Sequence, residues 1–249
     1  MMREPSPHNN LLVTRHLERV DVSDSSVAVA RKWARDSLTP SLATNPYLSD
    51  ITSAEKLLAK VQGVRIEMIV SSPFLRCVQT ARIVAEALGL DRVYIDYRVS
   101  ELNADILFDR PYDTDRVYET TTKYLADSPT TELVPLDDSY KGGTFEDEEA
   151  YVQRLQSGLK DLLKRGKNIL VVTHRSSLIW RGVAIDYADV YEVVARDLDS
   201  GSDSGSDSGS GPGSTPVGTQ AGAGVGAGAF AKYRKYKRKY LRLRARLAR

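Results

Sequence analysis

The sequence predicts an α/β fold, a three-layer α/β/α sandwich built around a mostly parallel sheet. Three segments repeat one pattern, an apolar strand followed by a short polar turn and a helix: "NNLLVTRH", "RIEMIVSSPFLRCVQTARIVAEALGL" and "KNILVVTHRSSLIWRGV". The Val, Ile and Leu runs are continuous, which is typical of strands buried on both faces of a parallel sheet. Strands that alternate with helical patterns indicate helices on both sides of that sheet.

The individual elements follow from these patterns. We expect strands at Leu11–Thr14, Ile66–Ser71 and Ile169–Thr173. We expect helices at Ser26–Arg35, Thr52–Val61, Phe74–Leu88 and Thr144–Lys164. Ser72 and Pro73 suit the N-cap and first positions of the third helix. Thr144 followed by Asp147 resembles a capping box at the start of the fourth helix.

Composition divides the chain into four parts. Residues 10–197 have an ordinary globular composition and follow a short N-terminus, residues 1–9, that we expect to be disordered. Residues 198–229 are rich in Gly, Ser, Asp and Ala, and bury too little apolar surface to offset their ordering entropy. We therefore expect a flexible linker there, joined to a basic amphipathic tail at 230–249.

The tail concentrates the positive charge of the chain. Residues 231–249 hold ten Lys or Arg and no acid, which leaves 25 basic and 33 acidic residues, a net charge of −8, for the rest. Tyr and Leu recur there every three or four residues and would form one stripe on a helix. We expect the tail to bind an anionic surface or nucleic acid, or to act as a nuclear import signal. A solvated tail with no partner is the alternative.

The cysteine count and the distribution of apolar residues bear on the cellular location of the protein. The single cysteine, Cys77, excludes an internal disulfide framework and fits a reducing compartment. We find no apolar run of the length that crosses a membrane, and the N-terminus lacks the apolar stretch of a secretory signal. We therefore expect a soluble cytoplasmic protein, with a nuclear or membrane-peripheral location through the tail as alternatives. No oligomeric state is predicted.

Basic side chains and histidines gather at one edge of the predicted sheet. Arg15 and His16 follow the first strand, and His174 follows the third. Arg76 lies in the first turn of a helix, where backbone N–H groups and the helix dipole already favour an anion. Each residue alone is typical of a surface or satisfied turn position. Their coincidence at the carboxyl ends of the strands, where such sheets bind ligands, predicts a phosphate site.

These residues lie in three motifs that occur together in a known family. "TRHLERVD", "SSPFLRCVQTA" and "VVTHRSS" resemble, in this order, the signatures of the histidine phosphatase superfamily, which has the phosphoglycerate-mutase-like fold. The resemblance covers residues 10–195. It is greatest to the branch of the ecdysteroid-phosphate phosphatases and the Sts-type protein phosphatases.

The resemblance implies a metal-independent phosphomonoesterase that works through a phosphohistidine. His16 would be the nucleophile, His174 would stabilise charge in the transition state, and Glu101 would donate the proton, with Asp105 as a nearby rival. The phosphate-binding residues would be Arg15, Arg19 and Arg76. The substrate would be a phosphoprotein or a small phosphomonoester. We expect no metal and no cofactor, since the chain lacks clustered Cys and His ligands and the arginines supply the positive charge.

Departures from the family pattern leave alternatives open. Leu17 and Arg175 replace the Gly that usually follows each histidine, and Leu at a positive φ would cost about 1–3 kcal/mol. A weak or inactive phosphatase-like binding module is therefore the alternative. A phosphoglycerate mutase is less favoured, because "ERVDVSD" lacks the Ser and Asn that mutases carry after the first motif. Residues 186–198 leave open whether the last strand of the family is present.

Overall fold

A computed structural model describes residues 10–18, 54–105, 107–108, 110–126 and 131–199 of the 249-residue chain. Four predictions lie outside these residues: Arg19 as a phosphate ligand, the helix at Ser26–Arg35, the disordered N-terminus at 1–9 and the basic tail. Almost all of the predicted linker, from residue 200 onward, lies outside them as well.

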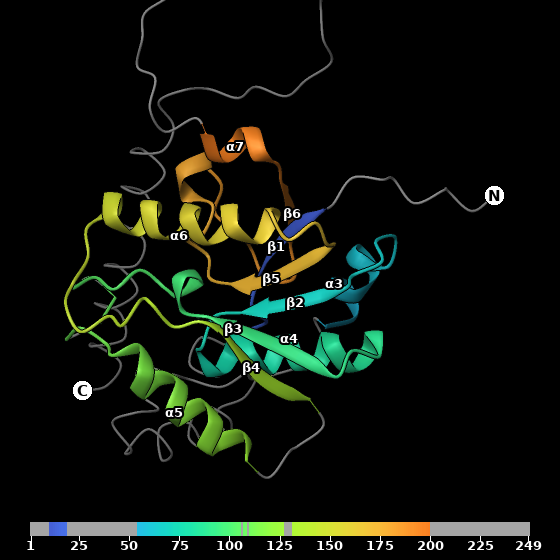
Figure 1. Cartoon of the computed structure of the whole chain (residues 1–249), viewed down its shortest axis with the longest axis horizontal. Helices are drawn as coiled ribbons and strands as arrows, with labels where there is room; N and C mark the ends of the chain where they lie inside the picture. Colours follow the sequence, from blue (N-terminus) through green and yellow to red (C-terminus); the bar gives the residue numbers. More distant parts are fainter. Residues whose placement is uncertain (1–9, 19–53, 106, 109, 127–130, 200–249) are drawn as a thin grey trace, which may run out of the picture.

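One six-stranded sheet forms the centre of the molecule (Figure 1). Its strands are β1 (Leu11–Arg15), β2 (Met68–Ser71), β3 (Arg92–Asp96), β4 (Glu132–Asp137), β5 (Ile169–Thr173) and β6 (Val190–Val193). They are ordered β4-β3-β2-β5-β1-β6, and only β6, which pairs with β1, runs antiparallel. The prediction of a mostly parallel sheet is confirmed, and the strand whose presence was left open exists as β6.

Helices cover both faces of the sheet and complete the three layers (Figure 1). They are α3 (Ala54–Val61), α4 (Leu75–Leu88), α5 (Thr114–Leu125), α6 (Glu148–Leu163) and α7 (Ala195–Asp199), with the 3₁₀ turns η1 (Tyr97–Val99) and η2 (Ile179–Arg181). Side chains alternate along β1, so Leu12 packs into the core on the side of α3 and α4. Leu11 and Val13 pack on the opposite side, with residues of α6.

Two helix starts differ from the prediction. Helix α4 begins at Leu75, and its N-cap is Phe74, which makes no side-chain cap hydrogen bond. Ser72 is therefore not the cap, because its hydroxyl binds another partner, described below. Helix α6 begins four residues later than Thr144, since the Asp147 carboxylate accepts a hydrogen bond from the Ala150 N–H at 2.8 Å and so caps the helix.

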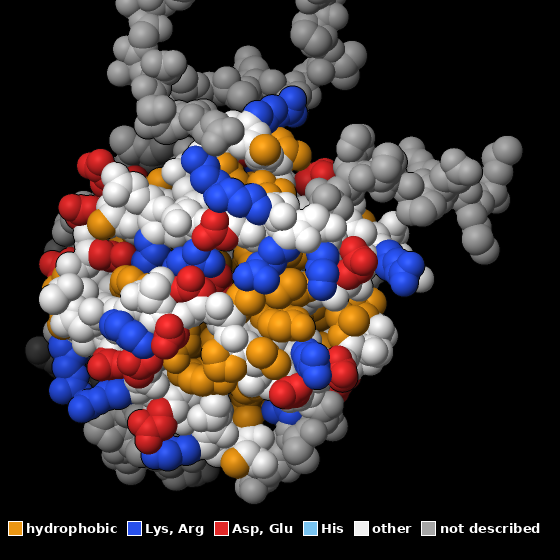
Figure 2. Space-filling model, viewed as in Figure 1, with side chains coloured by type: hydrophobic (Ala, Val, Ile, Leu, Met, Phe, Trp, Pro, Cys, Tyr) orange, Lys and Arg blue, Asp and Glu red, His pale blue; other side chains and the backbone are white. Residues whose placement is uncertain are grey.

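The described surface mixes charges of both signs. Figure 2 shows Lys and Arg side chains interspersed with Asp and Glu on one face, with hydrophobic side chains gathered around β3 and β4. The described part of this face therefore presents no large field of one sign. Within the described residues, no helix is both long and apolar enough to cross a membrane.

Candidate active site

His16 lies directly after β1, and its backbone fixes its position beside β5. The His16 N–H donates to the Thr173 carbonyl at 3.0 Å, and the residue is 2% exposed. Its ring Nδ1 lies 2.6 Å from the Leu17 carbonyl oxygen. A carbonyl only accepts hydrogen bonds, so Nδ1 carries the proton of the neutral ring. Nε2 consequently holds the lone pair, which is the requirement for a nucleophilic histidine.

His174 follows β5 and is fully buried among polar side chains. An Arg76 Nη2 group lies 3.0 Å from His174 Nδ1, and the Ser72 hydroxyl lies 2.8 Å from His174 Nε2. Because a guanidinium only donates, Nδ1 accepts from Arg76 and Nε2 donates to Ser72. The hydroxyl that was expected to cap α4 thus orients the second histidine.

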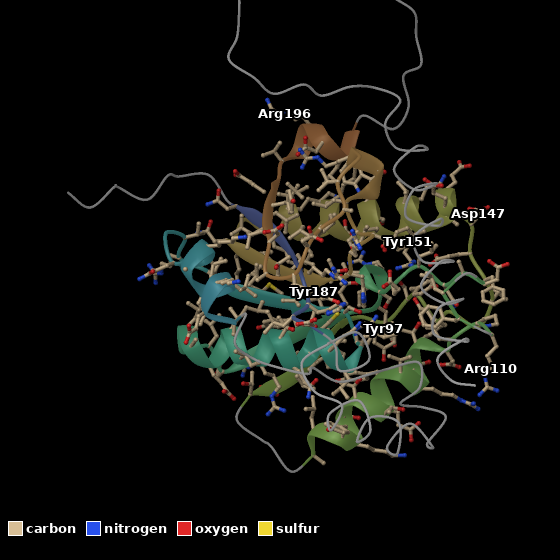
Figure 3. All side chains as sticks on the ribbon, turned by 180° about the vertical axis from the view of Figure 1, so that it is seen from behind. Tyr97, Arg110, Asp147, Tyr151, Tyr187 and Arg196 are labelled. Carbon is tan, nitrogen blue, oxygen red and sulfur yellow. The ribbon has the colours of Figure 1, made fainter. Side chains whose placement is uncertain are left out.

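The two imidazoles lie close enough to serve one bound group. The ring centroids of His16 and His174 are 5.7 Å apart, in an edge-to-face arrangement. Arg15 lies at the carboxyl end of β1, with its guanidinium carbon 3.6 Å from the ring centroid of Tyr187. Tyr187 pairs with Arg15 in an isolated parallel bridge beside the carboxyl ends of the strands (Figure 3). The Tyr187 ring centroid in turn lies 5.8 Å from that of His16, so Arg15 lies on the His16 side of the cluster and Arg76 on the His174 side.

Glu101 follows η1 and brings the single carboxylate of the cluster. It is 4% exposed, and its Oε2 lies 3.5 Å from His174 Nδ1 and 3.8 Å from Arg76 Nη2. Its Oε1 accepts a hydrogen bond from the Ser176 hydroxyl at 2.7 Å. The rival carboxylate, Asp105, is exposed. The geometry thus brings Glu101 into the cluster and favours it over Asp105.

A buried ion pair holds the backbone around Glu101. Arg154, on α6, donates to Glu146 through Nε at 3.1 Å and through Nη2 at 2.5 Å, and its Nη2 also reaches the Glu101 carbonyl at 3.5 Å. Its Nη1 donates to the Arg98 carbonyl at 2.6 Å. The Tyr112 hydroxyl donates to the Glu101 carbonyl as well. The loop that carries Glu101 is therefore anchored on several sides.

Cys77 lies on the first turn of α4 beneath the histidines. It is fully buried, and its Sγ is 3.6 Å from His174 Nε2. Burial raises the pKa of the Cys77 thiol to about 12, although the nearby Arg76 charge opposes this change. The thiol is consequently neutral at physiological pH, and it packs against the site without competing as a nucleophile.

The two departures from the family pattern cause no backbone strain. Among the described residues, Ala188 is the only non-glycine residue with a positive φ, so neither Leu17 nor Arg175 occupies that conformation. The Leu17 side chain is fully buried in the core, and its N–H donates to the Thr80 hydroxyl at 3.0 Å. The expected cost of a positive φ at Leu17 is therefore wrong.

Most of the predicted site residues come together in this cluster. They are Arg15, His16, Arg76, Glu101 and His174, whereas Arg19 lies outside the described residues. The sequence reasoning missed Ser72 and Ser176, although both stand inside quoted motifs, "SSPFLRC" and "THRSS". It also missed Tyr187 and Arg154, which no short motif signals because they reach the site from distant positions in the chain.

The sequence comparison identifies the family to which this architecture belongs. Residues 47–180 match the sequence model of the histidine phosphatase superfamily (branch 1). The chain therefore belongs to the histidine phosphatase superfamily, and the predicted resemblance is confirmed. No curated protein matches the sequence.

Among solved structures similar to this chain at low sequence identity, one has the same fold. The ecdysone phosphate phosphatase EPPase from Bombix mori, in complex with tungstate, has a TM-score of 0.57 and 15% identity, over 87% of this chain and 97% of that one. The α-ribazole phosphatase from Shigella flexneri has a TM-score of 0.42 and 19% identity, over 73% of this chain and 88% of that one. A mycobacterial glucosyl-3-phosphoglycerate phosphatase in complex with VO3 has a TM-score of 0.36 and 20% identity, over 69% of this chain and 78% of that one.

Proposed function

We propose that this protein is a metal-independent phosphomonoesterase that works through a phosphohistidine on His16. The observation that supports this most directly is the pair of buried imidazoles, 5.7 Å apart, beside the Arg76 guanidinium and the Glu101 carboxyl. Two guanidinium groups beside one carboxyl group give the cluster a positive balance, which suits a phosphate dianion. Membership of the histidine phosphatase superfamily is consistent with this assignment.

The first half of the reaction transfers the phosphoryl group to the protein. The Nε2 lone pair of His16 attacks phosphorus, and the bond from phosphorus to the ester oxygen breaks. The leaving oxygen takes a proton from Glu101, which becomes a carboxylate. Arg15 and Arg76 hold the phosphoryl oxygens, and His174 stabilises the charge that they carry in the transition state.

The second half returns the site to its starting state. Water attacks the phosphorus of phospho-His16 and loses a proton to the Glu101 carboxylate. The phosphorus–nitrogen bond breaks, and inorganic phosphate leaves. Phosphate monoesters hydrolyse so slowly that enzymes accelerate the reaction up to about 10²¹-fold, mostly through positioning and charge stabilisation. A general acid adds roughly 10²–10⁴-fold to this, which is the share assigned to Glu101.

A hydrolysis assay with a matched histidine control tests the proposal. The purified full chain is expected to release p-nitrophenol from p-nitrophenyl phosphate in the presence of a chelator, and vanadate is expected to inhibit it. His16→Ala should abolish turnover and the acid-labile phosphoenzyme. His8→Ala removes the histidine of the N-terminus and should retain both.

The opposite results would decide against the proposal. If the protein binds phosphorylated ligands without turnover and forms no phosphoenzyme, it is the phosphatase-like binding module named above as the alternative. If His16→Ala is as active as the parent protein, the nucleophile is wrongly assigned.

We also propose that the basic tail tethers the protein to an anionic partner, because ten positive charges lie within residues 231–249. Binding to vesicles containing an acidic phospholipid, or to duplex DNA, should weaken steeply as salt rises, since phosphate contacts release counterions. Deleting residues 230–249 should abolish it while phosphatase activity is retained. Binding that ignores both salt and the deletion would contradict the tail's role, and the two ligands separate a lipid surface from nucleic acid.

A further inference from the structure

Helix α6 contacts Glu101 through two side chains that lie one turn apart. Tyr151 reaches the Glu101 carboxyl through Ser176, and Arg154 reaches the Glu101 carbonyl. Residues three apart on a helix share one face. We propose that this face of α6 positions the proton donor, and that Ser176 fixes the Glu101 carboxyl so that Oε2 delivers the proton. This inference rests on the phosphatase function proposed above.

The carboxyl is held by a chain of hydrogen bonds with a defined direction. The Ser176 hydroxyl donates to Glu101 Oε1 at 2.7 Å, and the Tyr151 hydroxyl lies 2.9 Å from the Ser176 oxygen. Because Ser176 has one hydroxyl hydrogen and gives it to Glu101, Tyr151 must be the donor to Ser176. Burial and the nearby Glu101 carboxylate raise the pKa of Tyr151, so its hydroxyl stays protonated.

This series of hydrogen bonds is buried and orients the plane of the Glu101 carboxyl group. Tyr151 and Ser176 are both fully buried, and Tyr151 projects from α6, which covers one face of the sheet (Figures 1 and 3). Oε1 also lies 3.4 Å from the Leu102 N–H, which donates to it. Two donors thus point at Oε1, whereas Oε2 faces the histidine side of the cluster, 3.5 Å from His174 Nδ1. Oε2 is therefore the oxygen that would face a phosphate held by the histidine pair.

The contact of Arg154 with the Glu101 carbonyl fixes the backbone that carries the carboxyl group. The Arg154 and Glu146 side chains are each 9% exposed, and Glu146 also accepts a hydrogen bond at 2.9 Å from the N–H of Asn103, in the segment after η1. The Arg154 side chain also packs against the Tyr140 ring, with 3.8 Å between the guanidinium carbon and the ring centroid. A carboxyl that must donate a proton along one line gains from a fixed backbone, because small displacements of a catalytic group slow the reaction strongly.

The experiment uses the full chain and two aryl esters that differ only in their need for a proton. Phenyl phosphate releases a phenolate that must be protonated, whereas 2,4-dinitrophenyl phosphate releases an anion that is stable without a proton. We expect Ser176→Ala to lower kcat/KM about tenfold for phenyl phosphate and less than about twofold for the dinitrophenyl ester. Glu101→Gln should show the same selectivity with a larger ratio.

Two further variants keep the test decisive. Ser100→Ala removes an equally buried hydroxyl next to Glu101 that has no hydrogen-bond partner among the described residues, and it should leave the ratio of the two esters unchanged. Tyr151→Phe removes only the far end of the chain of hydrogen bonds. It should reduce phenyl phosphate turnover selectively, about threefold. If thermal unfolding shows that Ser176→Ala does not fold, Tyr151→Phe provides the answer.

The outcomes separate this inference from the function on which it rests. A parent protein that hydrolyses the dinitrophenyl ester in a His16-dependent manner upholds the function. Equal losses on both esters in Ser176→Ala and Tyr151→Phe, or no loss on either, would then overturn the positioning role alone. A parent protein that hydrolyses neither ester overturns both proposals together.

Discussion

Replacing Leu17 by glycine, the residue that the family usually has after the first histidine, tests whether this departure is a defect or a part of the core. If Leu17 were strained, Leu17→Gly would relieve the strain and stabilise the protein. The structure indicates the reverse, because the side chain is fully buried and the backbone is not in the left-handed region.

The magnitude follows from the burial. Truncating a fully buried Leu to Ala costs about 2–5 kcal/mol, from lost transfer free energy and the cavity that remains. Gly adds up to about 1 kcal/mol through the extra backbone entropy of the unfolded chain. We therefore expect Leu17→Gly to lower the free energy of unfolding by about 3–6 kcal/mol and Leu17→Ala by slightly less. For a domain of this size, each kcal/mol lowers Tm by roughly 2–4 °C.

Urea and thermal unfolding, followed by circular dichroism, measure the effect, and Arg175→Gly serves as the matched control. Arg175 is the other departure from the family glycine; it is exposed, and its nearest ion pair, to Asp186 at 3.9 Å, lies at the surface. We expect Arg175→Gly to lower the free energy of unfolding by no more than about 1 kcal/mol, the backbone cost of glycine alone. A Leu17→Gly protein with an unchanged or raised Tm would refute the reasoning.

Three further perturbations test other parts of the site and its support. Because burial raises the pKa of Cys77 from 9.0 to about 12, iodoacetamide at pH 8 should label the urea-unfolded chain but not the native one, and equal labelling would contradict this. The contribution of the protonated thiol to the free energy of unfolding should be lost as pH rises from about 9 to 12. Tyr187→Ala should raise KM for p-nitrophenyl phosphate about two- to fivefold through loss of the stack on Arg15, while Tyr187→Phe stays near the parent value; an equal effect of both variants would refute it. Arg98→Ala leaves the buried Asp96 carboxylate unpaired and should cost about 3–5 kcal/mol in urea unfolding, and a loss below about 1 kcal/mol would show that the pair is dispensable.

The fold could be predicted because the central strands are recognisable from their own apolar residues. The apolar runs at β1, β2 and β5 are continuous, and only strands buried on both faces need such runs. Strand β4 was not predicted, since its residues are half exposed and include Pro135. The short antiparallel strand β6 likewise has one buried residue, Val193, so that its pattern is too weak to separate from a loop.

The candidate site was predictable only where chemistry and position coincide in a motif. His16 and Arg76 stand next to strong strand and helix signals, so their common edge followed from topology. The supporting residues did not follow, because Ser72 has a plausible alternative use as a helix cap and Arg154 looks like an ordinary charged residue on a helix. Side-chain partners that are separated by 50 or more residues depend on packing, which no local pattern encodes.

The order of strands in the sheet has a consequence for folding during synthesis. Strand β5 emerges last among the three strands that carry the cluster, yet it lies between β1 and β2, which do not pair with each other. A nascent chain that ends before residue 169 would hold the two halves of the reaction centre with nothing to join them. The His16–His174 pair would then assemble only once β5 has been translated, late in the synthesis of the domain and in one step.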